Sequence, residues 1–151
     1  MTSALKTAQK YLKIKNVILK HAFINIDEDI DPEDLASLDH SSQNFRGVSL
    51  VKETNYGDEE HDWWDYGFNY SVGVRLIEDS DETTPLVEIK ATFSAIYTSD
   101  RRLKEEQIKA FLENNVGYHV WPYWREFVQS SCMRLDIELI EVPLYFFPPA
   151  T

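Results

Sequence analysis

Residues 66–77 read YGFNYSVGVRLI, with an apolar side chain at every even position from Tyr66 to Leu76. An apolar residue at every second position indicates a β-strand that buries one face. The stretch from Leu86 to Tyr97 repeats this pattern, with its inward side chains at the odd positions from Val87 onward. The polar residues 78–85 join the two stretches. The pair is therefore predicted to form an antiparallel hairpin.

Two further strands are expected before this hairpin. Residues 14–26 are rich in β-branched side chains and read as apolar on both faces, with Val17, Leu19 and Phe23 on one face and Ile18, Ala22, Ile24 and Ile26 on the other. A strand that is apolar on both sides needs cover on both sides, which suggests a partner subunit. Residues 45–54 predict a weaker fourth strand. Acidic connections are expected at residues 27–38 and 58–65.

The spacing of apolar residues changes after Asp100, which we expect to cap a helix. Apolar side chains then follow one another at intervals of three to four residues, and the helix is expected to reach Met133. Between Val116 and Val128 the helix is apolar almost all round, so one side packs on the sheet and the other implies a partner. Gly117 and Pro122 predict a kink. Residues 135–147 are expected to be an extended tail.

Length and composition exclude several classes of protein. The 151 residues suit a single domain, which we expect to span residues 1–151. A net charge of −11 disfavours binding to nucleic acid or to an anionic membrane surface. No apolar run approaches the roughly 18 residues of a membrane span. The single Cys132 excludes an internal disulfide and a zinc site with several cysteines. We therefore expect a cytoplasmic protein.

No catalytic pattern emerges. His21 and His119 fall within predicted elements and His40 and His61 in polar loops, which favours core or surface roles over catalysis. The acidic residues 58–65 carry oxygen ligands for a hard cation but lack the spacing of a calcium loop, which favours a solvated loop. We expect no enzyme activity, metal or cofactor. The surplus apolar surface fits either an oligomer interface or a site for unfolded polypeptide, and composition does not separate the two.

Three segments, in order, resemble SecB, the bacterial export chaperone. Trp121-Pro122-Tyr123-Trp124-Arg125-Glu126 is similar to its Phe-Pro-Tyr-x-Arg-Glu helix segment. Leu86-Val87-Glu88-Ile89 is similar to its Leu-x-Glu-Val strand, and Leu139-Ile140-Glu141-Val142-Pro143-Leu144-Tyr145-Phe146 is similar to its Leu-x-x-x-Pro-Val-Asn-Phe crossover. The resemblance covers residues 16–147.

The resemblance implies an α+β fold in which a four-stranded antiparallel sheet packs against a long, kinked C-terminal helix. It also implies a homotetramer, a dimer of dimers, that holds unfolded clients in hydrophobic grooves without ATP. By position, the groove residues are Val48, Leu50, Val142, Leu144, Tyr145 and Phe146, those that dock the translocation motor SecA are Leu86 and Glu88, and those of the oligomer or core helix are Trp121, Tyr123, Trp124 and Phe127.

Three departures concern the SecA side of this resemblance. His21 and Asn25 align where SecB places acidic residues, and the sequence stops just after the crossover. The acidic segment with Trp63-Trp64 is an insertion. The interpretation is an ATP-independent holdase for unfolded or precursor polypeptides, with export as its context. The alternatives are a SecB-like chaperone of a toxin–antitoxin system or a single-partner adaptor, followed by a small α+β enzyme.

Overall fold

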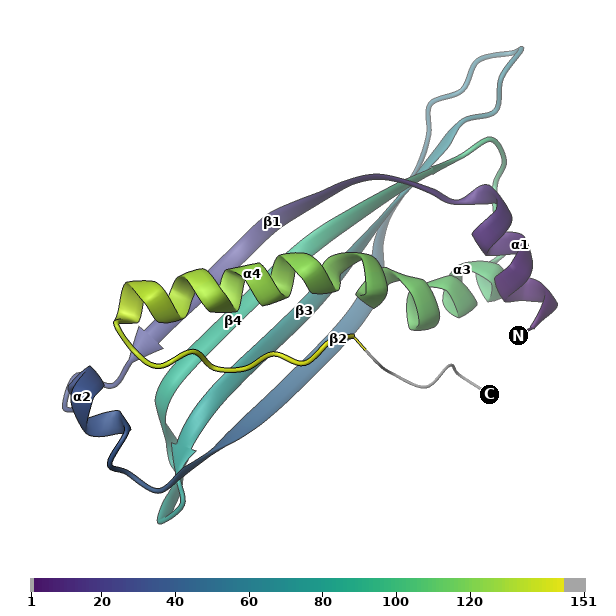
Figure 1. Ribbon diagram of the computed structural model, residues 1–151. Helices are drawn as coiled ribbons and strands as arrows, with labels where there is room; N and C mark the ends of the chain where they lie inside the picture. Colours follow the sequence, from purple (N-terminus) through teal and green to yellow (C-terminus); the bar gives the residue numbers. More distant parts are fainter. Residues whose placement is uncertain (1, 146–151) are drawn as a thin grey trace.

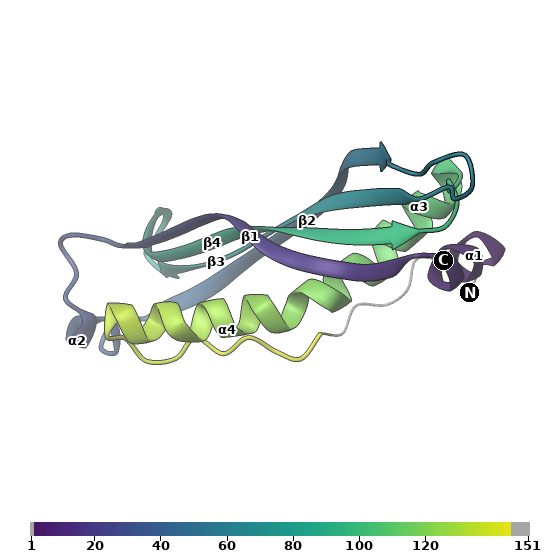
Figure 2. The same cartoon turned by 90° about the horizontal axis from the view of Figure 1, so that it is seen from above.

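A computed structural model describes residues 2–145 of the chain (Figure 1). Its core is a four-stranded antiparallel sheet with strand order β1-β4-β3-β2, confirming the predicted α+β fold. The elements are α1 (Ser3–Tyr11), β1 (Lys13–Ile26), α2 (Pro32–Leu35), β2 (His40–Asn55), β3 (Trp64–Glu78), β4 (Asp81–Ser99), α3 (Glu105–Phe111), the π-helical segment η1 (Leu112–Val116) and α4 (Gly117–Leu135). The helix α4 lies along one face of the sheet (Figures 1 and 2).

The core lies between that sheet face and the helix. The even positions of β3 from Tyr66 to Leu76 are buried, as are the odd positions of β4 from Val87 to Tyr97, as the alternation predicts. Trp124 of α4 and Phe111 of α3 are fully buried against them, and the Phe111 ring meets the Tyr97 ring edge-on at 4.9 Å between centroids. Such burial of large aromatic side chains supplies much of the driving force for folding.

The prediction that residues 78–85 form a polar connection is wrong. Glu78 pairs with Asp81, so the turn is only Asp79-Ser80 and the remaining polar residues extend the two strands. Asp81 steadies the turn, because its carboxylate accepts hydrogen bonds from the backbone N–H of Thr83 at 3.0 Å and from its hydroxyl at 2.6 Å. This end of the hairpin is exposed, so no apolar alternation marks the strands there.

The strand β1 does not have two apolar faces. Its pairing with β4 shifts register at Lys15 and again at Lys20, so each lysine is an extra residue in a β-bulge. An extra residue moves every later side chain to the other face. Val17 and Leu19 therefore share the helix-facing surface with Ala22, Ile24 and Ile26, and the opposite face keeps only Ile18 and Phe23 as large apolar side chains.

The helical stretch begins later than Asp100. Lys104 is the N-cap of α3, and its N–H donates to the Gln107 side chain at 2.9 Å, whereas the Asp100 carboxylate pairs with Arg101. The predicted kink corresponds to an irregularity at η1, which ends directly before Gly117, and the helix axis changes direction there (Figure 2). Asp136 then ends α4 in a left-handed conformation, with φ of 55°.

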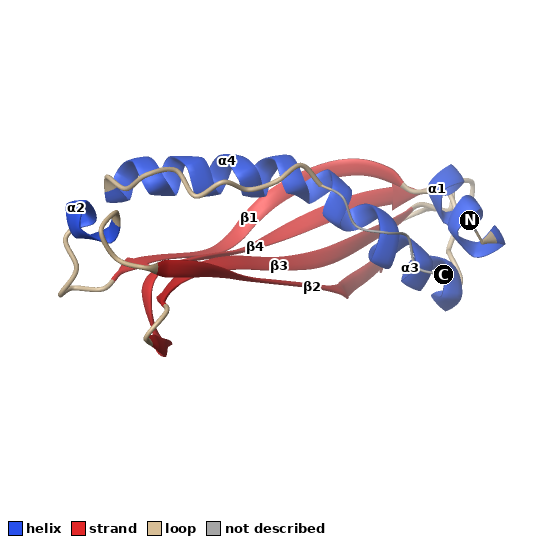
Figure 3. Ribbon diagram, turned by 60° about the horizontal axis from the view of Figure 1, so that its bottom comes forward, coloured by secondary structure: helices blue, strands red, loops and turns tan. Residues whose placement is uncertain are grey.

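The apolar pattern of the sequence did not predict two short helices, α1 and α2. In α1, Thr2 Oγ1 caps the helix by accepting from the Leu5 N–H at 3.2 Å, and the buried Leu5 and Ala8 face α3. The helix α2 interrupts the acidic connection and buries Leu35. After α4, residues 136–145 run back alongside the helix in extended form (Figure 3), and we call them the crossover. Within residues 2–145, no helix is both long and apolar enough to cross a bilayer.

Candidate functional site

A groove runs between β2 and the crossover, on the helix side of the sheet. One hollow of about 460 Å³ lies between the middle of β2, α4 and the crossover, and a second of about 450 Å³ continues toward α2. Both are lined by Ser42, Ile140 and Glu141, so they form one continuous trough, which we call the β2 groove. Its remaining walls include Asn44, Arg46, Trp121, Trp124, Val142, Leu35, His40 and Leu139.

The groove exists because β2 has small or polar side chains where β3 has large apolar ones. Ser42, Asn44 and Arg46 pair with Leu76, Val74 and Val72, so they stand on the helix-facing surface. Across the same surface β3 fills the space beneath α4, whereas serine and asparagine leave volume beneath the crossover. The result is an apolar floor with polar groups along one rim.

Hydrogen bonds from α4 hold the crossover over the groove. Trp121 Nε1 donates to the Pro143 carbonyl at 2.7 Å, and Arg125 Nε donates to the Val142 carbonyl at 3.2 Å. Further back, the Ile140 N–H donates to Cys132 Sγ at 3.5 Å. The crossover is therefore fixed to one face of the helix through its backbone, which leaves its side chains free to line the groove.

The far end of the groove closes where two tyrosines meet the helix. The Tyr145 ring packs edge-on against Trp121, with 5.4 Å between ring centroids. A Cβ on Gly117 would lie 2.8 Å from Tyr145 Oη and 2.9 Å from Tyr70 Oη, so glycine permits this approach. Burial raises the pKa of both tyrosine hydroxyls, and the neighbouring Arg46 guanidinium opposes that rise.

The structure brings together only part of the predicted groove set. Val142 lines the β2 groove, whereas Val48 is half-buried against the core. Leu50 lies further along β2 in a separate hollow of about 650 Å³. Leu144 is 75% exposed and lines neither hollow of the groove. Tyr145 packs on the helix as described, and Phe146 lies outside the described residues.

Sequence reasoning missed the polar half of the groove. Ser42, Asn44 and Arg46 share the parity of Val48 and Leu50 along β2, so the alternation of this strand was the available signal. In the crossover, Ile140 and Glu141 line the groove together with Val142. Their contribution depends on how the crossover lies against α4, which no local pattern encodes.

The predicted helix residues divide between core and surface. Trp124 is fully buried and stacks on Phe127 at 6.2 Å, and Trp121 is buried beside the crossover. Tyr123 is 49% exposed on the side of α4 that faces β4, where its ring approaches Phe93 at 6.4 Å between centroids. On the same sheet surface, Leu19 of β1 is 46% exposed. An apolar strip therefore remains open between α4 and β1.

The two residues aligned with SecA docking lie in different environments. Leu86 is buried in the core, because a register shift against β3 makes it an extra residue in β4. Glu88 stands on the opposite face of the sheet, and its carboxylate pairs with Lys90 at 3.2 Å. In this conformation Leu86 belongs to no surface.

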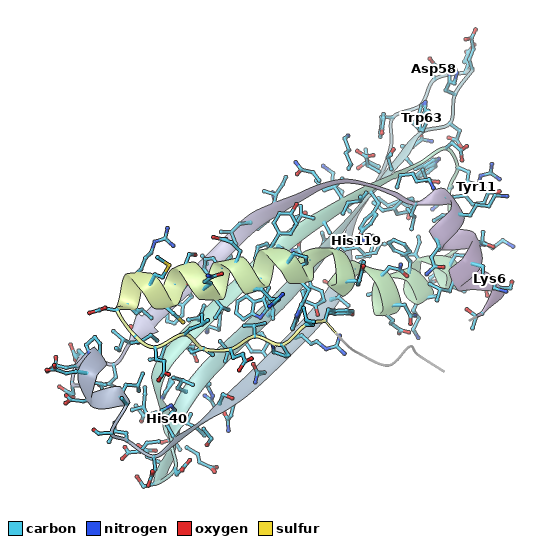
Figure 4. The ribbon with its side chains drawn as sticks, in the orientation of Figure 1. Lys6, Tyr11, His40, Asp58, Trp63 and His119 are labelled. Atoms are coloured by element: carbon cyan, nitrogen blue, oxygen red, sulfur yellow. The ribbon has the colours of Figure 1, made fainter. Side chains whose placement is uncertain are left out.

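His40, His119 and Asp58 lie in separate parts of the molecule (Figure 4). His119 Nδ1 lies 2.8 Å from the Tyr97 hydroxyl, and burial lowers the pKa of this imidazole and raises that of the phenol. Asp58 accepts hydrogen bonds from the backbone N–H groups of Glu60 and His61, which lowers its pKa. Among residues 2–145, no three metal-binding side chains gather.

Comparison with known proteins supports the fold. No family model and no curated protein matches this sequence. A solved structure of a SecB-like chaperone from Mycobacterium tuberculosis, in complex with a ChAD peptide from the HigA1 antitoxin, superposes with a TM-score of 0.70. The alignment covers 97% of this chain and 99% of that one, at 14% sequence identity. The SecB-like fold implied by the sequence resemblance is thereby confirmed.

Proposed function

We propose that this chain is a cytoplasmic, ATP-independent chaperone that holds an extended apolar stretch of an unfolded polypeptide in the β2 groove. The observation that carries the proposal is the groove itself, where Trp121, Ile140 and Val142 offer apolar contacts beside an open strand edge. Burial of apolar client surface contributes about 25 cal/mol per Å² before the costs of ordering. Binding is therefore modest at each site and reversible.

The edge of β2 makes such binding tolerant of sequence. It is one of the two edge strands, and no strand of residues 2–145 pairs with its free edge. From His40 to Leu50 it pairs with β3 without a register shift, which gives an unbroken edge of about 33 Å at 3.3 Å per residue. An extended client adds to such an edge by backbone hydrogen bonds, while alternate side chains enter the groove.

Charge favours basic segments as clients. At the end of the groove near α2, Glu138 and Glu141 line the walls, and Leu35 and Ala36 of the acidic connection border it. These carboxylates attract lysine and arginine side chains and repel acidic ones. A client segment with apolar residues followed by a basic residue matches this arrangement.

A dedicated client is the second candidate function. The polar rim of Ser42, Asn44 and Arg46 can select one hydrogen-bonding pattern, and a selective groove suits a single partner. The similar chaperone from Mycobacterium tuberculosis is described with an antitoxin peptide, which fits a toxin–antitoxin role. For export, coupling to SecA has less support, because Leu86 is buried and Glu88 is paired with Lys90.

We also propose that copies of the chain pair through the apolar strip between α4 and β1, and that two such pairs form a homotetramer. Tyr123 and Leu19 are both about half exposed there, and large exposed apolar patches mark interaction sites. Packing a second helix against this strip buries both side chains. The arrangement leaves the β2 groove on the opposite side of α4 open.

The proposal predicts that the chain suppresses light scattering when a denatured, unrelated protein is diluted into buffer without ATP. Near-stoichiometric amounts are expected to suffice. Val142→Ser is expected to weaken capture about tenfold, since a buried apolar contact is worth about 1.5–3 kcal/mol. The matched control is Leu144→Ser, because Leu144 lies two residues away and lines neither hollow. Circular dichroism checks that both variants keep the fold.

Equal capture by Val142→Ser and the wild type would remove the groove assignment. If the wild type fails to suppress scattering yet retains one protein from its own host, the dedicated-client function replaces the general holdase. Pull-down with the wild type and Val142→Ser side by side then shows whether that partner uses the same groove.

A further inference from the structure

The sheet face opposite α4 carries an aromatic row that the groove does not use. Phe23, Lys90, Gly73 and Phe45 are cross-strand partners in β1, β4, β3 and β2, so they stand in one line across the sheet. The crossover and α4 lie on the other face (Figure 2). We call this surface the outer face. Phe23 is 39% exposed and Phe45 is 50% exposed, so both rings present apolar surface to solvent.

The row is a built arrangement. The Phe45 ring lies directly over Gly73, whose missing Cβ makes room for it. Lys90 Nζ lies 4.7 Å from the centre of the Phe23 ring, within cation–π range. One step along the strands, Arg75 Nε donates to Gln43 Oε1 at 2.7 Å. A hollow of about 390 Å³ lies among Phe45, Arg75, Glu88 and Lys90.

The charge of the outer face is opposite to that of the whole chain. Beside the row, the basic Arg75 and Lys90 outnumber the acidic Glu88, whereas Lys13, Lys15, Lys52 and Asp65 lie toward the other end of the sheet. Both acids are already paired, Asp65 with Lys15 at 3.0 Å and Glu88 with Lys90 at 3.2 Å. The chain as a whole carries −11. The surroundings of the row are therefore a small basic area on an acidic molecule.

The local positive charge determines which kind of partner can bind to this surface. A long polyanion is repelled by the net charge of the chain, whereas a short acidic segment meets only the local basic area. Phe23 and Phe45 are three strand spacings apart, about 14 Å, and an extended peptide covers about 13 Å in four residues. Two apolar residues four positions apart therefore reach both rings, and the residue midway between them points the same way, which places its carboxylate over Lys90 and near Arg75.

We propose that the outer face docks an acidic segment of a partner protein, with two apolar residues four positions apart and a carboxylate midway between them. The phenylalanines anchor the segment, and the basic side chains orient it and speed its association. The surface is distinct from the β2 groove, so a client and this partner bind at the same time. The basic charge of this surface is opposite to that of the acidic docking face that the SecB resemblance implies.

Fluorescence anisotropy with a labelled nonapeptide, Gly-Ser-Leu-Glu-Asp-Glu-Leu-Ser-Gly, tests the proposal. The wild type is expected to bind it at low salt, and the version with Lys-Arg-Lys in place of the acids is expected not to bind. Lys90→Glu and Phe45→Ser are each expected to weaken binding about tenfold. Lys6→Glu is the charge-matched control, since Lys6 is exposed on α1, away from the outer face (Figure 4). Val142→Ser is expected to leave peptide binding unchanged.

Three results would overturn the assignment. The first is no binding of the acidic peptide by the wild type. The second is an equal loss in Lys6→Glu, which would indicate a response to net charge alone. The third is displacement of the peptide by a nine-nucleotide thymidine oligomer at equal concentration, which would make the surface a nucleic-acid site.

Discussion

At Gly117, the helix, the sheet and the crossover lie close together. A side chain there would meet the hydroxyl groups of Tyr145 and Tyr70 at less than 3 Å. Tyr145 belongs to the crossover and packs on Trp121, and Tyr70 is buried in β3. Glycine therefore fits this position better than alanine, even though alanine is about 1 kcal/mol more favourable in an unconstrained helix.

Gly117→Ala is accordingly expected to lower the free energy of unfolding by about 1–3 kcal/mol, the usual cost of overpacking. Urea unfolding measures it. Gly47→Ala is the matched control, because a Cβ at Gly47 meets nothing within 4 Å, and it is expected to change stability by less than about 0.5 kcal/mol. Equal stability of Gly117→Ala and the wild type would contradict the close approach.

His119 makes the stability of the fold depend on pH. Burial lowers its pKa below the usual 6.5, so the unfolded chain takes up a proton more readily than the folded one. Stability is therefore expected to fall as the pH drops through about 6.5, before most carboxylates titrate. Urea unfolding between about pH 7.5 and 5.5 measures this fall. The variant His119→Gln is expected to lose most of this fall in stability. The variant His61→Gln, which lies in the exposed loop, is expected to show the same fall as the wild type.

Among the elements, α4 and the crossover form one mechanical unit through Trp121. Trp121→Phe removes the donor to the Pro143 carbonyl but keeps an aromatic ring, and is expected to cost about 1 kcal/mol. Hydrogen exchange of the crossover amides should accelerate in this variant. Arg134→Ala is the control, because the described contact of Arg134 is with Ser130 on its own helix. An unchanged rate of hydrogen exchange in Trp121→Phe would mean that the hydrogen bonds made by Arg125 and Cys132 are enough to hold the crossover.

The elements also show what the sequence could and could not predict. The hairpin and the helix follow from periodicity, because one face of each is buried in an unbroken core. The faces of β1 were misassigned because Lys20 adds a residue to the strand, and no local pattern marks a bulge. The groove was only half predicted, since Ser42 and Asn44 matter for the volume they leave empty. That volume depends on where the crossover lies.

For the whole molecule, the open strip between α4 and β1 predicts assembly. Leu19→Glu is expected to yield smaller species than the wild type in native mass spectrometry, since it places a charge in the interface. Ile18→Glu is the matched control, because Ile18 is the neighbouring residue on the outer face. A wild type that stays monomeric at high concentration would contradict the assembly proposal, while the groove proposal would stand.

The two lysine-bearing bulges of β1 have a consequence in the terms of polymer chemistry. A unit with two reactive ends propagates a chain, whereas a unit with one reactive end terminates it. Charged side chains and bulges block strand addition at an edge, and β1 has both at Lys15 and Lys20. The sheet is thus monofunctional, with β2 as its reactive end. A subunit that adds an aggregation-prone strand to β2 caps the growing ladder and ends its growth.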